Sequence, residues 1–227
     1  MSDKPILYSA PMVRALLAGT KTQTRRILRS ETAICRDPAW EAVKGEDGVW
    51  RIAADTPEMF GDVPVGLRIA VGDRLYVREH WRTYSTLDDH PPRDITGVRV
   101  WYEADEGYKP KSRFRQGMHM PRWASRITLT VTDVRVQRLQ DISEADAIAE
   151  GIVETGCPSP TERFGVRIAE DDWCAGPTPR AAYSALWTHV NDKAGAPAGQ
   201  SSWDRNPWVA AYTFTVELAN IDQVRAA

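Results

Sequence analysis

The stretch Arg126–Leu139, "RITLTVTDVRVQRL", decides how the fold is read, because it is long enough to be the central strand of a sheet. In its first half, apolar residues alternate with polar ones at Ile127, Leu129 and Val131. In its second half the alternation continues with the opposite parity, at Val134 and Val136. A bulge near Thr132–Asp133 would return both sets to one face, and a strand that turns a barrel corner needs such a bulge.

Other segments have the pattern of further strands. The alternation in "VGDRLYVREHW" (71–81) and "GVRVWYEAD" (97–105) predicts two strands, and "NPWVAAYTFTVEL" (206–218) predicts a terminal one. A shorter strand is expected at Thr24–Leu28, and "KGEDGVW" (44–50) indicates a hairpin or loop.

Three segments predict helices. In the first, Pro11 suits the opening turn, Val13, Leu16 and Leu17 share one face, and Gly19 fits the position just past the end. The second is "DISEADAIAEG" (141–151), with Ser143 as cap and Gly151 as terminator. The third is "TPRAAYSALWTHVND" (178–192).

Together these elements predict one α+β domain over residues 1–227, a small closed or half-closed β-barrel with flanking helices. Polar insertions are expected near 30–66 and 153–178, the second as a long loop.

Composition limits the classes of function. The net charge of −2 gives no global attraction to nucleic acid, so any basic surface is local. No apolar run is long enough for a membrane span, and the first residues lack the apolar core of a signal peptide. Three distant cysteines indicate neither a disulfide framework nor a zinc site, which favours a reducing cytoplasm. The four histidines show no ligand spacing, so no metal or cofactor is expected, and the oligomeric state stays open.

The segment "LLAGTKTQTRR" (16–26) fits three interpretations: a solvated turn, a basic patch for nucleic acid, or a reactive centre around Lys21 and Thr24. Taken singly, Lys21 could cap the preceding helix and Thr24 could be an ordinary strand threonine.

In order along the chain, these motifs resemble the ASCH domain of the PUA-like superfamily. The resemblance is carried by the Gly-x-Lys-x-x-Thr-x-Arg pattern at Gly19, Lys21, Thr24 and Arg26, then by "VGDRLYVRE", the long strand, "DISEADAIAEG" and the terminal strand. The segments "HMPRWASRITL" and "WDRNPWV" are similar to the longer forms found in phages and prophages. The resemblance implies a PUA-like barrel and a general role in RNA binding.

A bacterial branch of that family hydrolyses N4-acetylcytidine with a lysine, a threonine three residues later and a glutamate from the later helix. By resemblance these are Lys21, Thr24 and Glu150, with Glu144 as the second choice for the glutamate. A threonine hydroxyl needs a base, which a neutral lysine can supply, whereas a cationic lysine would instead stabilise the oxyanion. Glu150 would then protonate the leaving nitrogen or orient the site.

Candidate walls for a cytosine pocket are Tyr8, Ser9, Arg26, Arg78, Glu79, Trp81 and Trp123, although each could equally serve packing. The most basic segment, residues 111–126, could contact RNA phosphates through Lys111, Arg113, Arg115, Arg122 and Arg126, or be a solvated loop. The sequence thus supports two alternative functions, an N4-acylcytidine amidohydrolase and a non-catalytic RNA-binding module. An RNA-cleaving nuclease ranks last, because no histidine or metal-carboxylate cluster is apparent.

Overall fold

The structure is a computed structural model that describes residues 2–28, 40–54, 63–169, 172–192 and 201–224. Its longer helices are α1 (Ala10–Leu17), α3 (Glu144–Ala149) and α4 (Pro179–Asn191). Its strands are β1 (Asp3–Leu7), β2 (Gln23–Ile27), β3 (Trp40–Lys44), β4 (Trp50–Ala54), β5 (Val63–Pro64), β6 (Arg74–Arg78), β7 (Trp81–Arg82), β8 (Trp101–Tyr102), β9 (Thr128–Arg138), β10 (Val153–Glu154), β11 (Phe164–Arg167), β12 (Trp173–Gly176) and β13 (Trp208–Glu217). Single-turn 3-10 helices are η2 (Ser85–Leu87), η3 (Pro92–Asp94), η4 (Gly117–His119), η5 (Arg122–Ala124) and η6 (Leu139–Asp141).

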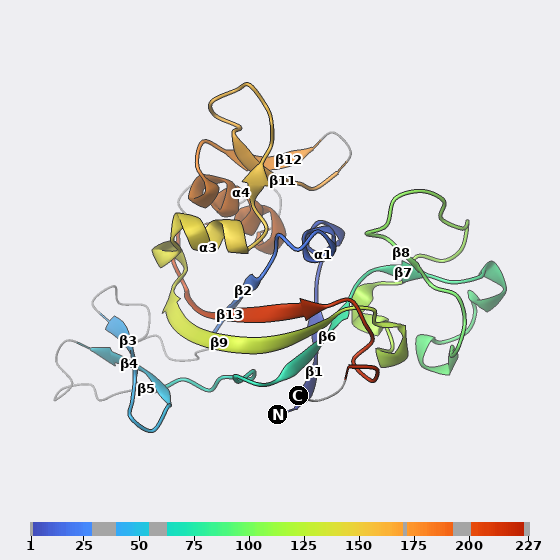
Figure 1. The fold of residues 1–227 in the computed structure, drawn as a ribbon, viewed down its shortest axis with the longest axis horizontal. Coiled ribbons are helices and arrows are strands. Elements are labelled where there is room, and N and C mark those ends of the chain that lie inside the picture. The colour runs from blue at the N-terminus through green and yellow to red at the C-terminus, as the bar shows by residue number, and fades with distance from the viewer. Residues whose placement is uncertain (1, 29–39, 55–62, 170–171, 193–200, 225–227) are drawn as a thin grey trace.

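A five-stranded sheet in the order β1-β6-β9-β13-β2 forms the centre of the molecule (Figure 1). The β1–β6 pair is parallel and the other pairs are antiparallel. The α+β class is therefore confirmed, whereas the closed barrel is not, because none of the sheets built from described residues closes on itself. The sheet instead bends so that a guanidinium nitrogen of Arg26, in β2, donates to the Leu7 carbonyl of β1 across 2.9 Å. We call the space between these two edge strands the seam.

The bend in the sheet comes from the bulge that the alternation predicts in β9. Strand β13 pairs with β9 throughout, but Thr213 faces Asp133 whereas the next residue, Phe214, faces Val131. Thr132 is thus the extra residue. It returns apolar residues on both sides of it to the buried face, and it allows β9 and β13 to curve together (Figure 1).

Helices α1, α3 and α4 lie against the concave side of this sheet, where the main hydrophobic core forms (Figure 1). In α1 the predicted residues Val13 and Leu16 are almost fully enclosed, whereas Leu17 is only partly buried against the core. The Thr178 hydroxyl caps α4 by accepting from the Ala181 amide, as its position before Pro179 predicts.

The segment 153–178 does not form the predicted loop. It contains the three-stranded sheet β10-β11-β12, which packs on α4 through Val166 and Cys174. Gly176 is essential to that packing, because a Cβ there would lie 2.7 Å from the Ala182 amide nitrogen. Glycines that look like loop formers in the sequence are thus needed for close contact between a strand and a helix.

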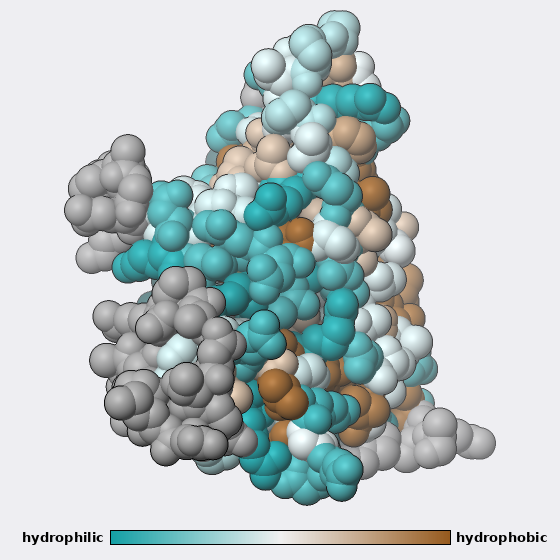
Figure 2. Space-filling model, turned by 90° about the vertical axis from the view of Figure 1, so that its left-hand side faces the viewer, coloured by the Kyte–Doolittle hydropathy of each residue, from teal (hydrophilic) through white to brown (hydrophobic). Residues whose placement is uncertain are grey.

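The hairpin expected at Lys44–Trp50 is confirmed as the turn between β3 and β4, within the sheet β3-β4-β5. Residues 29–39 and 55–62 of that predicted insertion lie outside the described residues. The hairpin side of the molecule is mainly hydrophilic, with small scattered hydrophobic patches (Figure 2). No helix in the described ranges is long and apolar enough to cross a membrane.

The strand predicted at 97–105 is mostly wrong, since only Trp101 and Tyr102 pair, with β7. Val98 and Val100 instead pack on a separate hydrophobic cluster, formed by Trp81, Ile95, Met120 and Ala124. We call it the Trp81 cluster. The alternation therefore predicted correctly which side chains are buried, but it did not predict the backbone pairing.

Candidate functional site

Two segments distant in sequence meet at the turn that follows α1. Gly19, in the left-handed conformation at φ 72°, ends the helix, and the Thr22 amide then donates to the Ala149 carbonyl at the end of α3 over 2.8 Å. Lys21 and Glu150 consequently face each other as a β-bridge. Gly151 lets the chain leave α3 here, because a Cβ there would lie 2.9 Å from that of Ala15.

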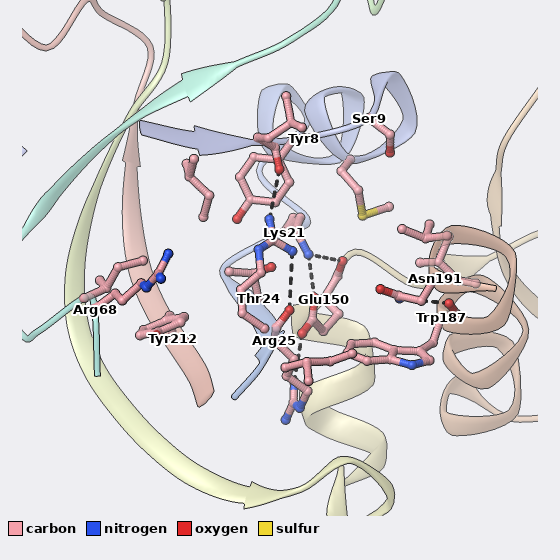
Figure 3. A pocket seen from close by; sticks show the side chains of 18 of the residues that line it. Tyr8, Ser9, Lys21, Thr24, Arg25, Arg68, Glu150, Trp187, Asn191 and Tyr212 are labelled. Carbon is pink, nitrogen blue, oxygen red and sulfur yellow. Dashed lines mark hydrogen bonds and ion pairs between the residues drawn. The ribbon is translucent and has the colours of Figure 1, made fainter. Parts of the chain in front are cut away.

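The side chains of Lys21 and Glu150 form a buried ion pair. Lys21 Nζ lies 2.6 Å from Glu150 Oε2 and also donates to the Glu150 carbonyl over 2.8 Å. Both side chains are at most 4% exposed. Thr24, equally buried, lies beside them and lines the same cavity (Figure 3). The three residues that the resemblance implies therefore converge in one place.

Arg25, close enough to Lys21 in sequence to act as a neighbouring cation, also completes a hydrogen-bond network with Glu150 and Asp146. Its Nη1 lies 3.0 Å from Glu150 Oε1, and its Nη2 lies 3.0 Å from Asp146 Oδ2. Gln23 Nε2 donates to the other Asp146 oxygen. The Tyr183 hydroxyl approaches Glu150 Oε1 at 3.4 Å. Both carboxylate oxygens of Glu150 therefore accept from protein donors.

The surroundings of Lys21 disfavour its charged form. Burial lowers the pKa of the Lys21 amine, and the Arg26 and Arg25 guanidinium groups lower it further, although Glu150 acts in the opposite direction. Burial also raises the pKa of Tyr8 to about 12, and the nearby Thr24 hydroxyl partly offsets this. The Tyr8 hydroxyl is enclosed and has no partner of standard hydrogen-bond geometry among the described residues.

The site opens into a cavity of about 1020 Å³ at the seam. One side is formed by β1 and β2, and the other by α4 (Figure 3). The lining includes Tyr8, Ser9, Met12, Lys21, Thr24, Arg25, Arg26, Arg68, His80, Glu150, Tyr183, Leu186, Trp187, Val190, Asn191 and Tyr212. The volume is sufficient for a nucleoside-sized ligand.

Three of the predicted pocket residues line this cavity: Tyr8, Ser9 and Arg26. Tyr8 forms a wall, Ser9 precedes α1 as its N-cap, and the Arg26 guanidinium stacks over the Tyr8 ring with 5.1 Å between Cζ and the ring centroid.

The other four predicted pocket residues lie outside the lining. Arg78 donates to the Met118 carbonyl and the Tyr76 hydroxyl. Glu79 is buried against Arg126, with 2.9 Å between Oε1 and Nε. Trp81 is the fully buried centre of its cluster. Trp123 donates from Nε1 to the Ile95 carbonyl and packs on that cluster. These side chains stabilise the fold around the cavity instead of lining it.

Glu144, the second choice for the carboxylate, also lies outside the cavity, since it accepts from the Arg180 amide at the start of α4 over 2.8 Å.

Most of the predicted phosphate contacts in residues 111–126 are engaged within the protein. Arg115 is buried and donates to the Leu87 and His90 carbonyls, which end η2 and the turn after it. Arg122 pairs with Asp3 and Asp222, and Arg126 pairs with Glu79 and Asp105. Lys111 and Arg113 are exposed. The basic segment is thus largely structural.

Three residues that line the cavity, Tyr183, Arg68 and Tyr212, were not predicted as pocket residues because their sequence signals are unspecific. Tyr183 lies in the apolar stripe of α4, where a tyrosine usually packs, Tyr212 lies in the predicted terminal strand, and Arg68 belongs to no motif. Within the described ranges, no group of three or more His, Cys, Asp or Glu side chains could hold a metal ion. Cys157 and Cys174 are free thiols, and Cys35 lies outside the described residues.

No family model, curated protein or solved structure matches this chain.

Proposed function

We propose that this chain is an amidohydrolase that cleaves the N4-acyl amide bond of N4-acetylcytidine or related N4-acylated cytosine nucleosides. The products would be cytidine and a carboxylic acid. The observation that carries the proposal is the contact of 2.6 Å between Lys21 Nζ and Glu150 Oε2, in a cavity that Thr24 also lines. The membership of the ASCH domain and PUA-like family that the motifs imply is part of the same proposal.

In this mechanism the Thr24 hydroxyl oxygen adds to the acyl carbon while Lys21 accepts its proton. The C–N bond then breaks, and the cytosine N4 leaves with the proton that Lys21 returns. Water next adds to the ester on Thr24, which releases the carboxylic acid and restores the hydroxyl. In the overall reaction, the amide and one water molecule give the amine and the carboxylic acid.

The environment of Lys21 supports the role of base over that of cationic oxyanion stabiliser. Burial lowers its pKa despite the opposing effect of Glu150, and two guanidinium groups add to the lowering, which increases the neutral fraction that can accept a proton. Glu150 orients the amine, since its own oxygens already accept from Lys21 and Arg25. An orienting carboxylate beside a base is the general arrangement of activated nucleophiles.

The direct test is to incubate the purified chain with N4-acetylcytidine and to follow cytidine by absorbance and chromatography. We expect turnover that Thr24→Val lowers at least about a thousandfold, because valine keeps the shape and removes the nucleophile. Lys21→Met should act similarly. Thr22→Val is the matched control, because Thr22 is an exposed threonine of the same segment outside the cavity lining.

Absence of turnover with acetyl and longer acyl nucleosides, in a sample shown to be folded by circular dichroism, would contradict the proposal. The alternative of a non-catalytic RNA-binding module of phage origin then remains. It has less support, since three of the five basic residues proposed for phosphate contact are held by protein partners.

A further inference from the structure

The cavity is cationic, although the chain as a whole has a net charge of −2. Its described lining contains the basic side chains of Lys21, Arg25, Arg26 and Arg68, of which the three arginines stay charged, but Glu150 as the only carboxylate. Since Glu150 already accepts from both Lys21 and Arg25, it does not compensate the charges of Arg26 and Arg68. The cavity therefore attracts anions.

Neither Arg26 nor Arg68 forms an ion pair with any described residue. Arg26 is held across the seam by neutral acceptors, the carbonyls of Leu7 at 2.9 Å and Arg25 at 3.3 Å. Backbone carbonyls fix the direction of a guanidinium group but leave its charge uncompensated. Arg68 is exposed and faces the same cavity.

Tyr212 places both arginines at one end of the cavity. The pairing of β13 with β2 sets Tyr212 opposite Thr24, two residues before Arg26 on the same strand. Burial raises the pKa of Tyr212, and the charge of the nearby Arg26 acts in the opposite direction. Figure 3 shows Arg68 next to Tyr212, on the opposite side of Lys21 and Glu150 from α4. We call Arg26, Arg68 and Tyr212 the cationic end.

The opposite end of the cavity has a different character. There α4 contributes Leu186, Trp187 and Val190, which are apolar and suit an acyl chain. Because the reactive groups lie between the two ends, a bound N4-acylcytosine would direct its acyl group toward α4 and its sugar toward the cationic end.

Building on the proposed function, we propose that the cationic end binds a phosphate group of the substrate. The preferred substrate would then be an N4-acylated cytosine nucleotide, not the uncharged nucleoside. Guanidinium groups match the geometry of phosphate oxygens and keep their charge at every physiological pH. The same phosphate chemistry is available in a mononucleotide and in an RNA strand.

The test compares kcat/KM for N4-acetylcytidine and for its 5′-monophosphate. We expect the monophosphate to be preferred by about tenfold or more, which corresponds to one charge-assisted phosphate contact. Raising the salt concentration should reduce this preference, because ionic screening weakens exposed charge contacts. Equal values for the two substrates would overturn the inference while leaving the amidohydrolase proposal intact.

Arg68→Gln tests the assignment to the cationic end. We expect the ratio of the two kcat/KM values to fall about tenfold in this variant. Arg93→Gln is the control, since the Arg93 side chain is 86% exposed and outside the cavity lining, and its ratio should stay as in the wild type. An unchanged ratio in Arg68→Gln would overturn the assignment.

A short RNA oligonucleotide with one N4-acetylcytidine identifies the source of the phosphate. If the acetyl group is removed faster from the oligonucleotide than from the monophosphate, the site binds RNA phosphates. The reverse order indicates that it binds free nucleotides. If no substrate turns over, equilibrium binding of cytidine 5′-monophosphate and cytidine tests the phosphate site by itself. Tenfold tighter binding of the monophosphate supports the inference, and equal or absent binding overturns it.

Discussion

Lys21 is an amine that pairs with the Glu150 carboxylate near two guanidinium groups, with almost no access to water. Burial favours its neutral form, Arg25 and Arg26 add to that effect, and Glu150 opposes it. Tyr8 also faces the amine, with 5.7 Å between Nζ and the ring centroid. In the proposed mechanism, the protonation state of Lys21 therefore decides whether Thr24 can react.

The proposed role of Lys21 gives a pH prediction. Protonated Lys21 cannot accept the Thr24 proton, so kcat/KM should rise with pH through the pKa of Lys21, and burial places that midpoint below the usual lysine value of 10.5. In Glu150→Gln the rising limb should move to lower pH, because the carboxylate that favours the charged amine is gone. A midpoint above 10.5, or one that Glu150→Gln leaves in place, would contradict this role. Circular dichroism across the range verifies that the protein stays folded.

At the scale of elements, the site depends on the meeting of the α1 turn with the end of α3. The Ser143 hydroxyl caps α3 by accepting from the Asp146 amide over 3.0 Å. The carboxylate of Asp146 in turn accepts from Arg25, Gln23 and Arg135. The cap of a short helix is therefore connected to the groups that position Glu150.

We expect Ser143→Ala to lower the free energy of unfolding by about 1 kcal/mol, the usual cost of a lost helix cap. It should also reduce kcat more than it changes KM, because looser Asp146 contacts disturb Arg25 and with it the position of Glu150, whereas Ser143 and Asp146 themselves lie outside the cavity lining. Urea unfolding and steady-state kinetics measure the two effects. Ser85→Ala is the control, as Ser85 is exposed and gives η2 no side-chain cap. A loss of stability in Ser143→Ala with unchanged kcat would show that the helix cap does not influence the site.

At the scale of the whole molecule, the hydrophobic residues divide between the main core under α1, α3 and α4 and smaller satellite clusters. The Trp81 cluster supports the segments around β7 and β8, which Figure 1 shows to one side of the central sheet. Trp81 is fully buried there and lies outside the cavity lining. Its role is therefore packing.

Trp81→Phe should consequently destabilise the protein by about 1 to 3 kcal/mol, through the volume lost in a tightly packed cluster. KM for the acylated substrate should stay within about twofold of the wild-type value, because distant sites behave independently. Thermal unfolding and kinetics well below the melting temperature check both parts. A large rise in KM at unchanged stability would instead indicate that Trp81 contributes to substrate binding.

Elements with local sequence signals could be predicted from the sequence alone. The cap at Ser143, the terminators Gly19 and Gly151, the stripe of α1 and the bulge at Thr132 are all confirmed, because each depends on neighbours within a few residues. The motif around Lys21 and Thr24 also indicated the centre of the site, although its chemistry stays a prediction.

The remaining features depend on contacts that form only in the folded chain. The sheet in residues 153–178 is stabilised by burial against α4, and the edges of the central sheet approach at the seam without closing. Likewise, only the fold shows that Arg25 shares Glu150 with Lys21, and that Trp81 and Glu79 lie away from the cavity. Such contacts join residues many positions apart, and burial, which decides charge and reactivity, is a property of the folded chain and not of any short segment.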